Sequence, residues 1–397
     1  MAENAVRGVS SQRIILITGG GLATLLFAVI AADSPTRALL FMIGLAMGIA
    51  LYHASFGFSG AYRNLLTKRD MTGVAAQIVM LIAAILLFAP ILAQGNAFGH
   101  GVTGSIAPVG LSMGFGAFLF GIGMQLGSGC ASGVLYTAGG GNVRTLLVLV
   151  FFCFGAFWGS LDIGWWQTLP GIGSVSLAKE LGWEIALPLQ IGALILIFFG
   201  LRLSGWSMRP ITEWPNGLSW SSVLKGPWPL FISALLLALL NWATLLVAGH
   251  AWSITWAFTL WGAKIAALSG WDPATSGFWS GGFQQAALAR SILGDTTSVM
   301  NIAVVLGALL AASIAGSFYK RLPPSPGPLV AAVVAGLLMG YGARLSYGCN
   351  IGAFFSGVAS SSLHGWVWIL CALPGNAVGI ALRRPFRMDA TQSVSST

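Results

Sequence analysis

The chain has 397 residues, of which 56% are hydrophobic and 7% are charged, with a formal net charge of +9. Soluble domains average about 25% charged residues, so this composition excludes a soluble protein and predicts an all-α integral membrane protein. The cations are scattered between apolar runs and form no basic face, so we expect no nucleic-acid partner and assign them to membrane topology.

Apolar runs along the whole chain predict a polytopic bundle of about 10–12 spans in contact with membrane lipid, built as one membrane domain over residues 1–397. The first run follows Arg7 and Arg13. It exceeds the apolar core of a signal peptide, which is about 7–15 residues, so we expect a retained helix. In chain order, the predicted helices are 14–32, 36–54, 73–93, 106–126, 143–161, 186–203, 229–248, 252–270, 298–317, 328–346 and 364–382.

Four further stretches are too apolar for ordinary loops and too short or too rich in glycine to span, namely 55–66, 128–140, 276–293 and 349–361. Irregular backbone is tolerated at membrane depth only where protein or a water-filled cavity surrounds it. Broken, re-entrant helices at matching places in two halves of a chain are typical of a transport site. We therefore expect such a site where these stretches meet.

Two of these stretches carry a duplicated motif that contains a cysteine. Residues 121–133 read GIGMQLGSGCASG and residues 340–352 read GYGARLSYGCNIG, identical at six of thirteen positions with a constant offset of 219 residues. A weaker match places 58–62 over 279–283 at an offset of 221 residues. The motifs therefore predict two repeat halves. These are 14–161 and 229–382, joined by a connector over 162–228 with one extra helix and followed by a cytoplasmic tail over 383–397.

Lysine and arginine positions set the predicted orientation, because cytoplasmic loops carry the excess of these residues. Arg7 and Arg13 place the N-terminus in the cytoplasm, but eleven crossings would then leave the cationic tail from Arg383 outside. One crossing in the second half is therefore miscounted: either 276–293 spans or 229–270 crosses only once. With that correction both termini are cytoplasmic and the two halves form an inverted repeat.

The repeated Gly-x-Gly-Cys turn predicts a site for an anion, because a turn that leads into a short helix presents free backbone N–H groups. In apolar surroundings Cys130 and Cys349 stay protonated, and a neutral S–H is a weak donor that suits a small inorganic anion carrying sulfur. Small residues also mediate helix packing in membranes, which is the alternative for any single glycine. The candidate substrate-binding residues of the two turns are Ser128, Gly129, Cys130, Gly348, Cys349 and Asn350.

Two cations inside predicted spans are further candidates, because intramembrane charges mark substrate pathways. Arg344 lies within the second motif and Lys264 lies in the middle of an apolar run, whereas none of the ten carboxylates lies at the centre of a span. An anion path is therefore favoured over a cation path. Cys153 and Cys371 lie inside apolar runs and are predicted to pack. The sequence has no CxxC, HExxH or Cys/His cluster, so we expect no disulfide, metal or cofactor.

The second motif continues as GARLSYGCNIGAFFSG over residues 342–357, followed by Ser362-Leu-His364, and the first contains GSGCASG over residues 127–133. In these residues the chain resembles the YeeE/YedE family of sulfur-compound transporters, and most closely its longer YedE-like members. The resemblance implies broken helices that meet as an hourglass-like pore and thiosulfate uptake across the bacterial inner membrane. It also implies that Cys130 and Cys349 contact the ion through S–H hydrogen bonds, and that a small cytoplasmic sulfur-carrier protein is a partner.

One position departs from the pattern of that family, whose members commonly have a third cysteine in an N-terminal segment. Here the segment reads FGFSGAYR over residues 56–63, with Gly57 in place of the cysteine. Gly57 is therefore a further candidate site residue, and a related sulfur or selenium species stays open as the substrate. A channel for another solute, in which the cysteines only pack, is one alternative. A membrane persulfide-carrying sulfurtransferase would need an activated thiolate beside a base, and we predict a transporter and not an enzyme.

Overall fold

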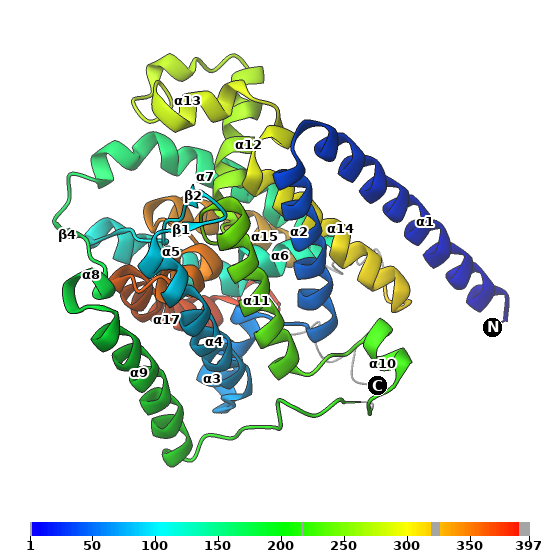
Figure 1. Cartoon of the computed structure of the whole chain (residues 1–397). Coiled ribbons are helices and arrows are strands. Elements are labelled where there is room, and N and C mark those ends of the chain that lie inside the picture. The colour runs from blue at the N-terminus through cyan, green and yellow to red at the C-terminus, as the bar shows by residue number, and fades with distance from the viewer. Residues whose placement is uncertain (1, 216, 319–325, 389–397) are drawn as a thin grey trace.

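The computed structural model describes residues 2–215, 217–318 and 326–388, with side chains described from residue 12 onward. Residues 389–397 of the predicted tail therefore lie outside the described residues. Helices make up most of the described chain, and they gather into one bundle with α1 and α9 at its edge (Figure 1).

The helices of the first half of the chain are α1 (Ala2–Asp33), α2 (Pro35–Ala54), α3 (Phe58–Lys68), α4 (Thr72–Gln94), α5 (Leu111–Gly127), α6 (Ala131–Gly139), α7 (Val143–Trp166), α8 (Leu177–Leu181) and α9 (Trp183–Leu203). Those of the second half are α10 (Trp220–Lys225), α11 (Leu230–Ala248), α12 (Thr255–Leu268), η1 (Pro273–Thr275), α13 (Gly282–Ala289), η2 (Ile292–Gly294), α14 (Thr296–Ile314), α15 (Gly327–Leu345), η3 (Asn350–Phe355), α16 (Ser356–Ala359) and α17 (Leu363–Leu382). Short strands pair antiparallel, β1 (Asn96–Ala97) with β2 (His100–Gly101) and β3 (Pro108–Gly110) with β4 (Gly171–Ser174).

Ten helical stretches of the described chain are long and apolar enough to cross a membrane, which confirms a polytopic all-α membrane protein. Helix α12 is not one of them, because its 14 residues fall short of the roughly 20 that a span needs. The stretch 276–293 does not span either, since it forms only α13, part of η2 and irregular backbone. The run 229–270 thus contributes one candidate span, α11. This agrees with the alternative in which 229–270 crosses the membrane only once.

The apolar run at 252–270 starts with irregular backbone because two buried asparagines supply its hydrogen bonds. The Oδ1 atom of Asn241 accepts from the backbone N–H of Trp252 at 2.8 Å. The Nδ2 group of Asn301 donates to the carbonyl of Ile254 at 2.9 Å. A buried peptide group without a partner would cost several kcal/mol, on the order of 2–7. These two amides remove that cost and allow the chain to turn before α12 begins.

Glycines bring the long helices into close contact. Helix α7 packs along α15, and α5 packs along α17. A Cβ atom on Gly121 would clash with the carbonyl of Ala372, and one on Gly340 would clash with the carbonyl of Phe152. Small residues let helix backbones approach closely in a membrane. For Gly121 and Gly340, which begin the two copies of the motif, the packing interpretation is therefore confirmed.

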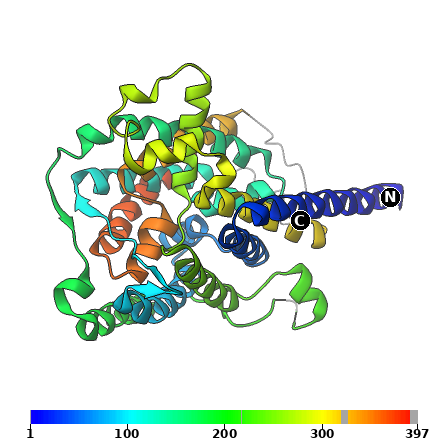
Figure 2. The ribbon, with the colours of Figure 1, turned by 45° about the horizontal axis from the view of Figure 1, so that its top comes forward.

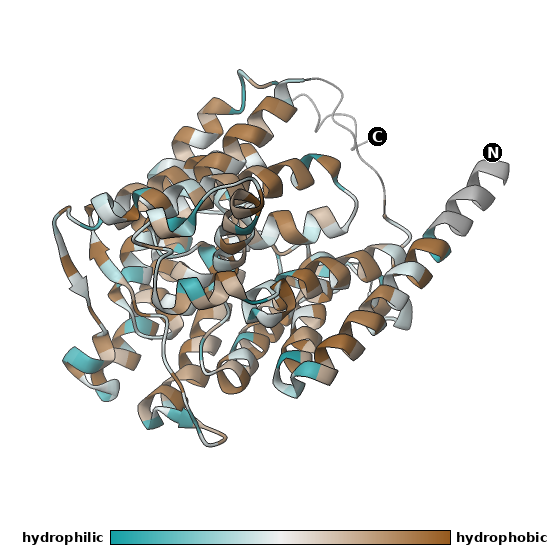
Figure 3. Cartoon of the chain, turned by 90° about the horizontal axis from the view of Figure 1, so that it is seen from above, coloured by the Kyte–Doolittle hydropathy of each residue, from teal (hydrophilic) through white to brown (hydrophobic). Residues whose placement is uncertain are grey.

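The outer faces of the peripheral helices are apolar. Ile17 on α1 is 73% exposed and Leu196 on α9 is 74% exposed. Figure 2 shows α1 extending away from the bundle, and Figure 3 shows hydrophobic residues along most helices with hydrophilic ones gathered in the connections. Such faces would be unfavourable in water, and their apolar character matches a lipid surrounding.

Candidate functional site

The first cysteine segment, residues 127–133, is a sharp turn between α5 and α6. Ser128 ends α5 with a left-handed backbone (φ 58°). Cys130 follows with an extended backbone (φ −78°, ψ −172°) and precedes the first residue of α6. A left-handed residue of this kind commonly ends a helix. The turn therefore places the cysteine directly at the start of a short helix.

The second cysteine segment, residues 346–352, repeats this geometry. Tyr347, at the position that corresponds to Ser128, also has φ 58°. Gly348 has φ 152°, a conformation that favours glycine. Cys349 is extended (φ −116°, ψ −167°) and precedes η3, which is a short π-helix. The sequence repeat is thus a repeat of backbone conformation.

The glycine before each cysteine lies against the helix that follows it. A Cβ atom on Gly129 would lie 3.1 Å from the carbonyl carbon of Gly133. One on Gly348 would lie 2.7 Å from the backbone nitrogen of Ala353. These two glycines therefore form the turns themselves, whereas Gly121 and Gly340 allow neighbouring helices to pack closely.

Both motif cysteines are free thiols buried at helix starts. Cys130 is 1% exposed, and its Sγ lies 3.2 Å from Oγ of Ser132. Cys349 is 0% exposed, and its Sγ accepts from the backbone N–H of Ile351 at 3.4 Å. Each sulfur therefore lies at the N-terminal end of a short helix, a favourable setting for an anion.

A small group of aromatic and polar side chains joins the two segments. The Nδ2 group of Asn350 donates to the hydroxyl of Tyr62 at 3.5 Å. Phe58 contacts both Tyr62 and Phe354, with ring centroids 6.3 and 6.5 Å apart. Helix α6, which begins after Cys130, packs against η3, which begins after Cys349. The structure thus brings the two predicted cysteines together through residues of α3 and η3.

In the part of the chain that the structure describes, the side-chain amide of Asn350 has a hydrogen-bond partner at its nitrogen but not at its oxygen. Its Oδ1 atom is buried and has no hydrogen-bond partner among the described residues. Leaving a buried acceptor unpaired costs about 1–3 kcal/mol. Within the two turns Asn350 is the predicted residue with such an acceptor, so a bound group that donates to Oδ1 would relieve this cost.

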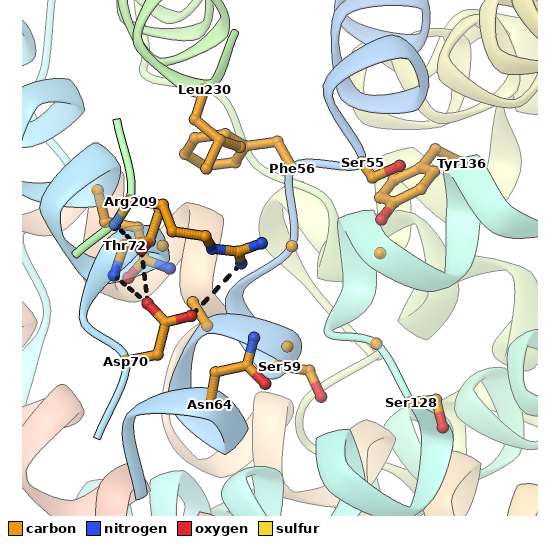
Figure 4. A pocket seen from close by; sticks show the side chains of 17 residues that line it. Ser55, Phe56, Ser59, Asn64, Asp70, Thr72, Ser128, Tyr136, Arg209 and Leu230 are labelled. Carbon is orange, nitrogen blue, oxygen red and sulfur yellow. Dashed lines mark hydrogen bonds and ion pairs between the residues drawn. The ribbon is translucent and has the colours of Figure 1, made fainter. Parts of the chain in front are cut away.

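A cavity of about 230 Å³ lies between α3 and α6, and we call it the α3–α6 cavity (Figure 4). The predicted site residues Gly57, Ser128 and Gly129 line it. Tyr136 lines it as well, and a Cβ atom on Gly57 would lie 3.6 Å from the Tyr136 hydroxyl. The cavity therefore brings the N-terminal segment with Gly57 against the first cysteine segment.

An ion pair occupies the other side of this cavity in Figure 4. Asp70 accepts from the hydroxyl of Thr72 at 2.5 Å and from Arg209 at 3.4 Å. Burial alone would raise the pKa of Asp70, but the hydrogen bonds from Thr72 and the charge of Arg209 outweigh it and hold that pKa below its usual value. The carboxylate thus stays ionised and is paired with a guanidinium at this side of the cavity.

Two arginines that the sequence analysis did not select stabilise the first turn. Arg383 is 3% exposed and donates to the carbonyl of Gln125 at 2.8 Å and to the Ser128 hydroxyl at 3.3 Å. Arg144 donates to the same hydroxyl at 3.2 Å and to the carbonyl of Leu126. Cations at the C-terminal carbonyls of a helix are favourable. Their positions at helix ends are a signal that could have identified them.

The second turn has a different support, which we call the Ser346 clamp (His364 and Trp368 bound to Ser346). The Nε2 atom of His364 lies 2.9 Å from the carbonyl of Ser346. The Nε1–H group of Trp368 donates to the Ser346 hydroxyl at 3.0 Å. Both residues belong to α17, so the last helix holds the second cysteine segment in place.

The structure does not bring the two predicted cations to the cysteines. Lys264 donates from Nζ to the carbonyls of Leu288 and Arg290, at 2.8 and 2.6 Å. Arg344 lies over the ring of Phe278, with Cζ 4.9 Å from the centroid. Their contacts are therefore with α13 and the loop before it.

Cys153 and Cys371 lie away from the turns on α7 and α17, within the main cluster of apolar side chains. The two motif cysteines thus differ from them in lying at the start of a helix. No three His, Cys, Asp or Glu side chains of the described residues lie together as a metal site would require.

Comparison with known proteins adds to this geometry. A family model described as sulphur transport matches residues 53–378. The thiosulfate transporter TsuA of Spirochaeta thermophila is 30% identical over 348 residues, which cover 84% of this chain and 95% of that protein. The thiosulfate transporter TsuA of Escherichia coli is 22% identical over 345 residues, or 84% of this chain and 90% of that protein. A probable transporter of Escherichia coli, YedE, is 30% identical over 155 residues, 38% of each chain.

Proposed function

The chain belongs to the sulphur transport (YeeE/YedE) family of membrane transporters, and we propose that it takes up thiosulfate or a closely related sulfur-containing anion. The proposal rests on one observation above all. Two turns that share a left-handed residue and an extended cysteine hold buried free thiols at helix starts, and Asn350 after the second turn contacts Tyr62 on α3. We assign Cys130 and Cys349 as groups that contact the passing ion.

The chemistry of the two turns suits transient binding of such an anion. Neutral thiols do not repel it and are weak hydrogen-bond donors, and their sulfur is polarisable like the terminal sulfur of thiosulfate. Backbone N–H groups at the helix starts add partial positive charge. Conduction requires binding strong enough for entry and weak enough for exit. Two weak sites in series, one at each cysteine, meet that requirement.

We further propose that the halves 14–161 and 229–382 form an inverted repeat around an hourglass-like pore. The element order α5, α6, α7 recurs as α15, η3 with α16, and α17. Helices of one half pack on helices of the other, since α5 packs on α17 and α7 packs on α15. An even number of candidate spans places both termini on one side, in our proposal the cytoplasm of a bacterial cell with the protein in its inner membrane.

Three partners belong to this proposal: the anion, a sulfur-carrier protein and membrane lipid. The anion reaches the first cysteine through the α3–α6 cavity or leaves by it, since Gly129 and Gly133 line that space. A small cytoplasmic sulfur-carrier protein that receives the anion remains a prediction from the family resemblance. Membrane lipid would cover the apolar outer faces of α1 and α9.

The proposal is tested by growth of a bacterial strain that lacks other thiosulfate importers, with thiosulfate as sole sulfur source. Wild type should support growth, whereas the double variant Cys130→Ser/Cys349→Ser should not. The matched control is Cys153→Ser/Cys371→Ser, which removes two thiols outside the turns and should grow like wild type. Immunoblots of membranes establish equal abundance.

Two outcomes would contradict the proposal in different ways. If wild type fails at normal abundance, thiosulfate is not the substrate, and growth on other sulfur or selenium anions identifies the related species. If both double variants grow equally well, the motif cysteines only pack and the path of the solute lies elsewhere.

A further inference from the structure

The hydroxyl of Tyr136 is a polar group of the α3–α6 cavity that has no partner of its own. Tyr136 lies on α6, the short helix that Cys130 starts, and its side chain lines the cavity on the side opposite Asp70 and Arg209 (Figure 4). Its hydroxyl makes no hydrogen bond among the described residues. Gly133 lines the same cavity, and a Cβ atom on it would lie 3.8 Å from the Cys130 sulfur, so the thiol lies just behind this wall. A hydroxyl in this position is available to a ligand.

The other hydroxyls around this cavity are engaged or lie at its exposed end. Ser59 donates to the carbonyl of Met124 at 2.9 Å. Ser128 is held by two guanidinium groups, and Thr72 donates to Asp70. Ser55 is exposed. Tyr136 is therefore the hydroxyl of this cavity that lies next to Cys130 and is free to donate.

Gly57 leaves this hydroxyl open to the cavity. Its backbone is extended (φ −135°, ψ 130°), so its conformation does not require glycine. The atoms nearest to a Cβ on Gly57 would be the Tyr136 hydroxyl at 3.6 Å and the Ser55 carbonyl oxygen at 3.8 Å, both ordinary contact distances. A side chain at position 57 would thus fit, and it would cover the hydroxyl.

We propose that the Tyr136 hydroxyl binds an oxygen of the transported anion while the Cys130 thiol contacts its sulfur, so that Tyr136 selects for anions that carry both atoms. A hydroxyl is a stronger donor than a thiol and prefers the harder oxygen. The α3–α6 cavity is then a binding subsite, and Gly57 keeps it accessible. This inference rests on the proposed function, because it takes an oxygen- and sulfur-containing anion as the substrate.

The test is a double-variant cycle in proteoliposomes, with initial rates of radiolabelled thiosulfate uptake measured over a range of concentrations. Tyr136→Phe removes the donor and should raise KM about tenfold, because one hydrogen bond to a charged group is lost. The maximal rate should stay within about twofold of wild type. Gly57→Ala covers the donor with one methyl group and should raise KM in the same direction. The double variant should be no worse than Tyr136→Phe alone, since both changes remove the same contact.

Two matched controls separate this role from a structural one. Tyr52→Phe removes a hydroxyl that is bound to Ser317 at 2.9 Å and does not line the cavity, so KM should stay unchanged. Gly164→Ala adds a methyl group where no atom lies within 4 Å, and it should also leave KM unchanged. Thermal stability of each purified variant establishes that it is folded.

The results distinguish this proposal from the one on which it rests. An unchanged KM in folded Tyr136→Phe, with wild type active and Cys130→Ser impaired, would overturn the role of Tyr136 and leave thiosulfate transport intact. If Tyr136→Phe does not fold, an unchanged KM in Gly57→Ala would overturn the proposal, and a raised KM would support it. Absent uptake by wild type, for thiosulfate and for the related sulfur and selenium anions alike, would refute the proposed function itself.

Discussion

Ser128 and Gly129 of the first segment line the α3–α6 cavity, whereas Tyr347 of the second segment lines a separate cavity of about 310 Å³ between β3 and the C-terminal end of α7. The Ser346 clamp holds the second segment. The backbones of the two segments are alike, with a left-handed residue at Ser128 and Tyr347 and an extended cysteine two positions later. The repeat therefore specifies the turn, and residues outside the repeat decide which cavity each turn borders. On this account the first cysteine segment exchanges the anion with the α3–α6 cavity, and the second passes it on.

The two segments also differ in the residue that lies five positions before each cysteine. Gln125 corresponds to Arg344 at the offset of 219 residues. The Nε2 group of Gln125 donates to Asn376 at 2.6 Å and to the carbonyl of Ser59 at 3.0 Å, entirely within the helical core. Arg344 instead lies over the Phe278 ring in the loop before α13. Each residue contacts the broken stretch of its own half, but one uses an amide and the other a cation.

The largest expected effect comes from the glycine that precedes each cysteine. Gly348→Ala combines a positive φ of 152° with a Cβ position 2.7 Å from the nitrogen of Ala353. Strain and overpacking cost about 1–3 kcal/mol each, so this variant should lose about 2–6 kcal/mol of stability. Gly129→Ala meets only the packing contact at 3.1 Å and should lose no more than about 1–3 kcal/mol. Thermal unfolding in detergent measures both, and equal losses would contradict the difference drawn between the segments.

A smaller effect is expected at the arginines of the first turn. Arg383→Gln removes charge-assisted hydrogen bonds to the carbonyl of Gln125 and to Ser128, worth about 1.5–3 kcal/mol. Arg384→Gln changes the exposed neighbour and is the matched control. We expect a lower unfolding temperature and slower uptake for Arg383→Gln only. Similar behaviour of the two variants would show that the first turn does not depend on Arg383.

The smallest effect concerns the ion pair beside the first segment. Because the pKa of Asp70 is lowered in the folded protein, its contribution is present above the unfolded pKa of about 3.9 and is lost as pH falls through the lower folded value. Asp70→Asn should therefore cost less than about 1 kcal/mol at pH 7, since Arg209 is largely exposed. Wild type and variant should converge in unfolding temperature as pH falls below the folded pKa of Asp70. A difference that persists there would assign the effect to packing and not to charge.

The sequence predicted the membrane class and the two turns because both depend on local features. Glycine next to cysteine, repeated at one offset, determines a backbone turn without reference to the rest of the chain. The support of each turn depends on distant residues instead: Arg383 reaches Gln125 from 258 positions away, and His364 reaches Ser346 across 18 positions. Contacts between residues far apart in the chain leave no periodic pattern in the sequence that would predict them.

The two predicted cations illustrate the same limit. Hydropathy identifies Lys264 and Arg344 as charges in apolar runs, which made both of them candidates for the substrate path. It cannot tell that Lys264 is bound to two carbonyls near α13 or that Arg344 stacks on an aromatic ring. Helix α12 was overestimated for a related reason, because the amides of Asn241 and Asn301 support irregular backbone where hydropathy alone predicts a span.

The most direct test of the central claim compares the two cysteine segments in one transport assay. Initial rates of radiolabelled thiosulfate uptake are measured for Cys130→Ser, Cys349→Ser and Cys371→Ser at equal membrane abundance. The account predicts that each of the first two variants loses about tenfold to a hundredfold at low substrate concentration, the value of one contact to a charged ligand. Cys371→Ser should transport like wild type. Loss at only one motif cysteine, or equal rates in all three variants, would contradict a path that passes both thiols.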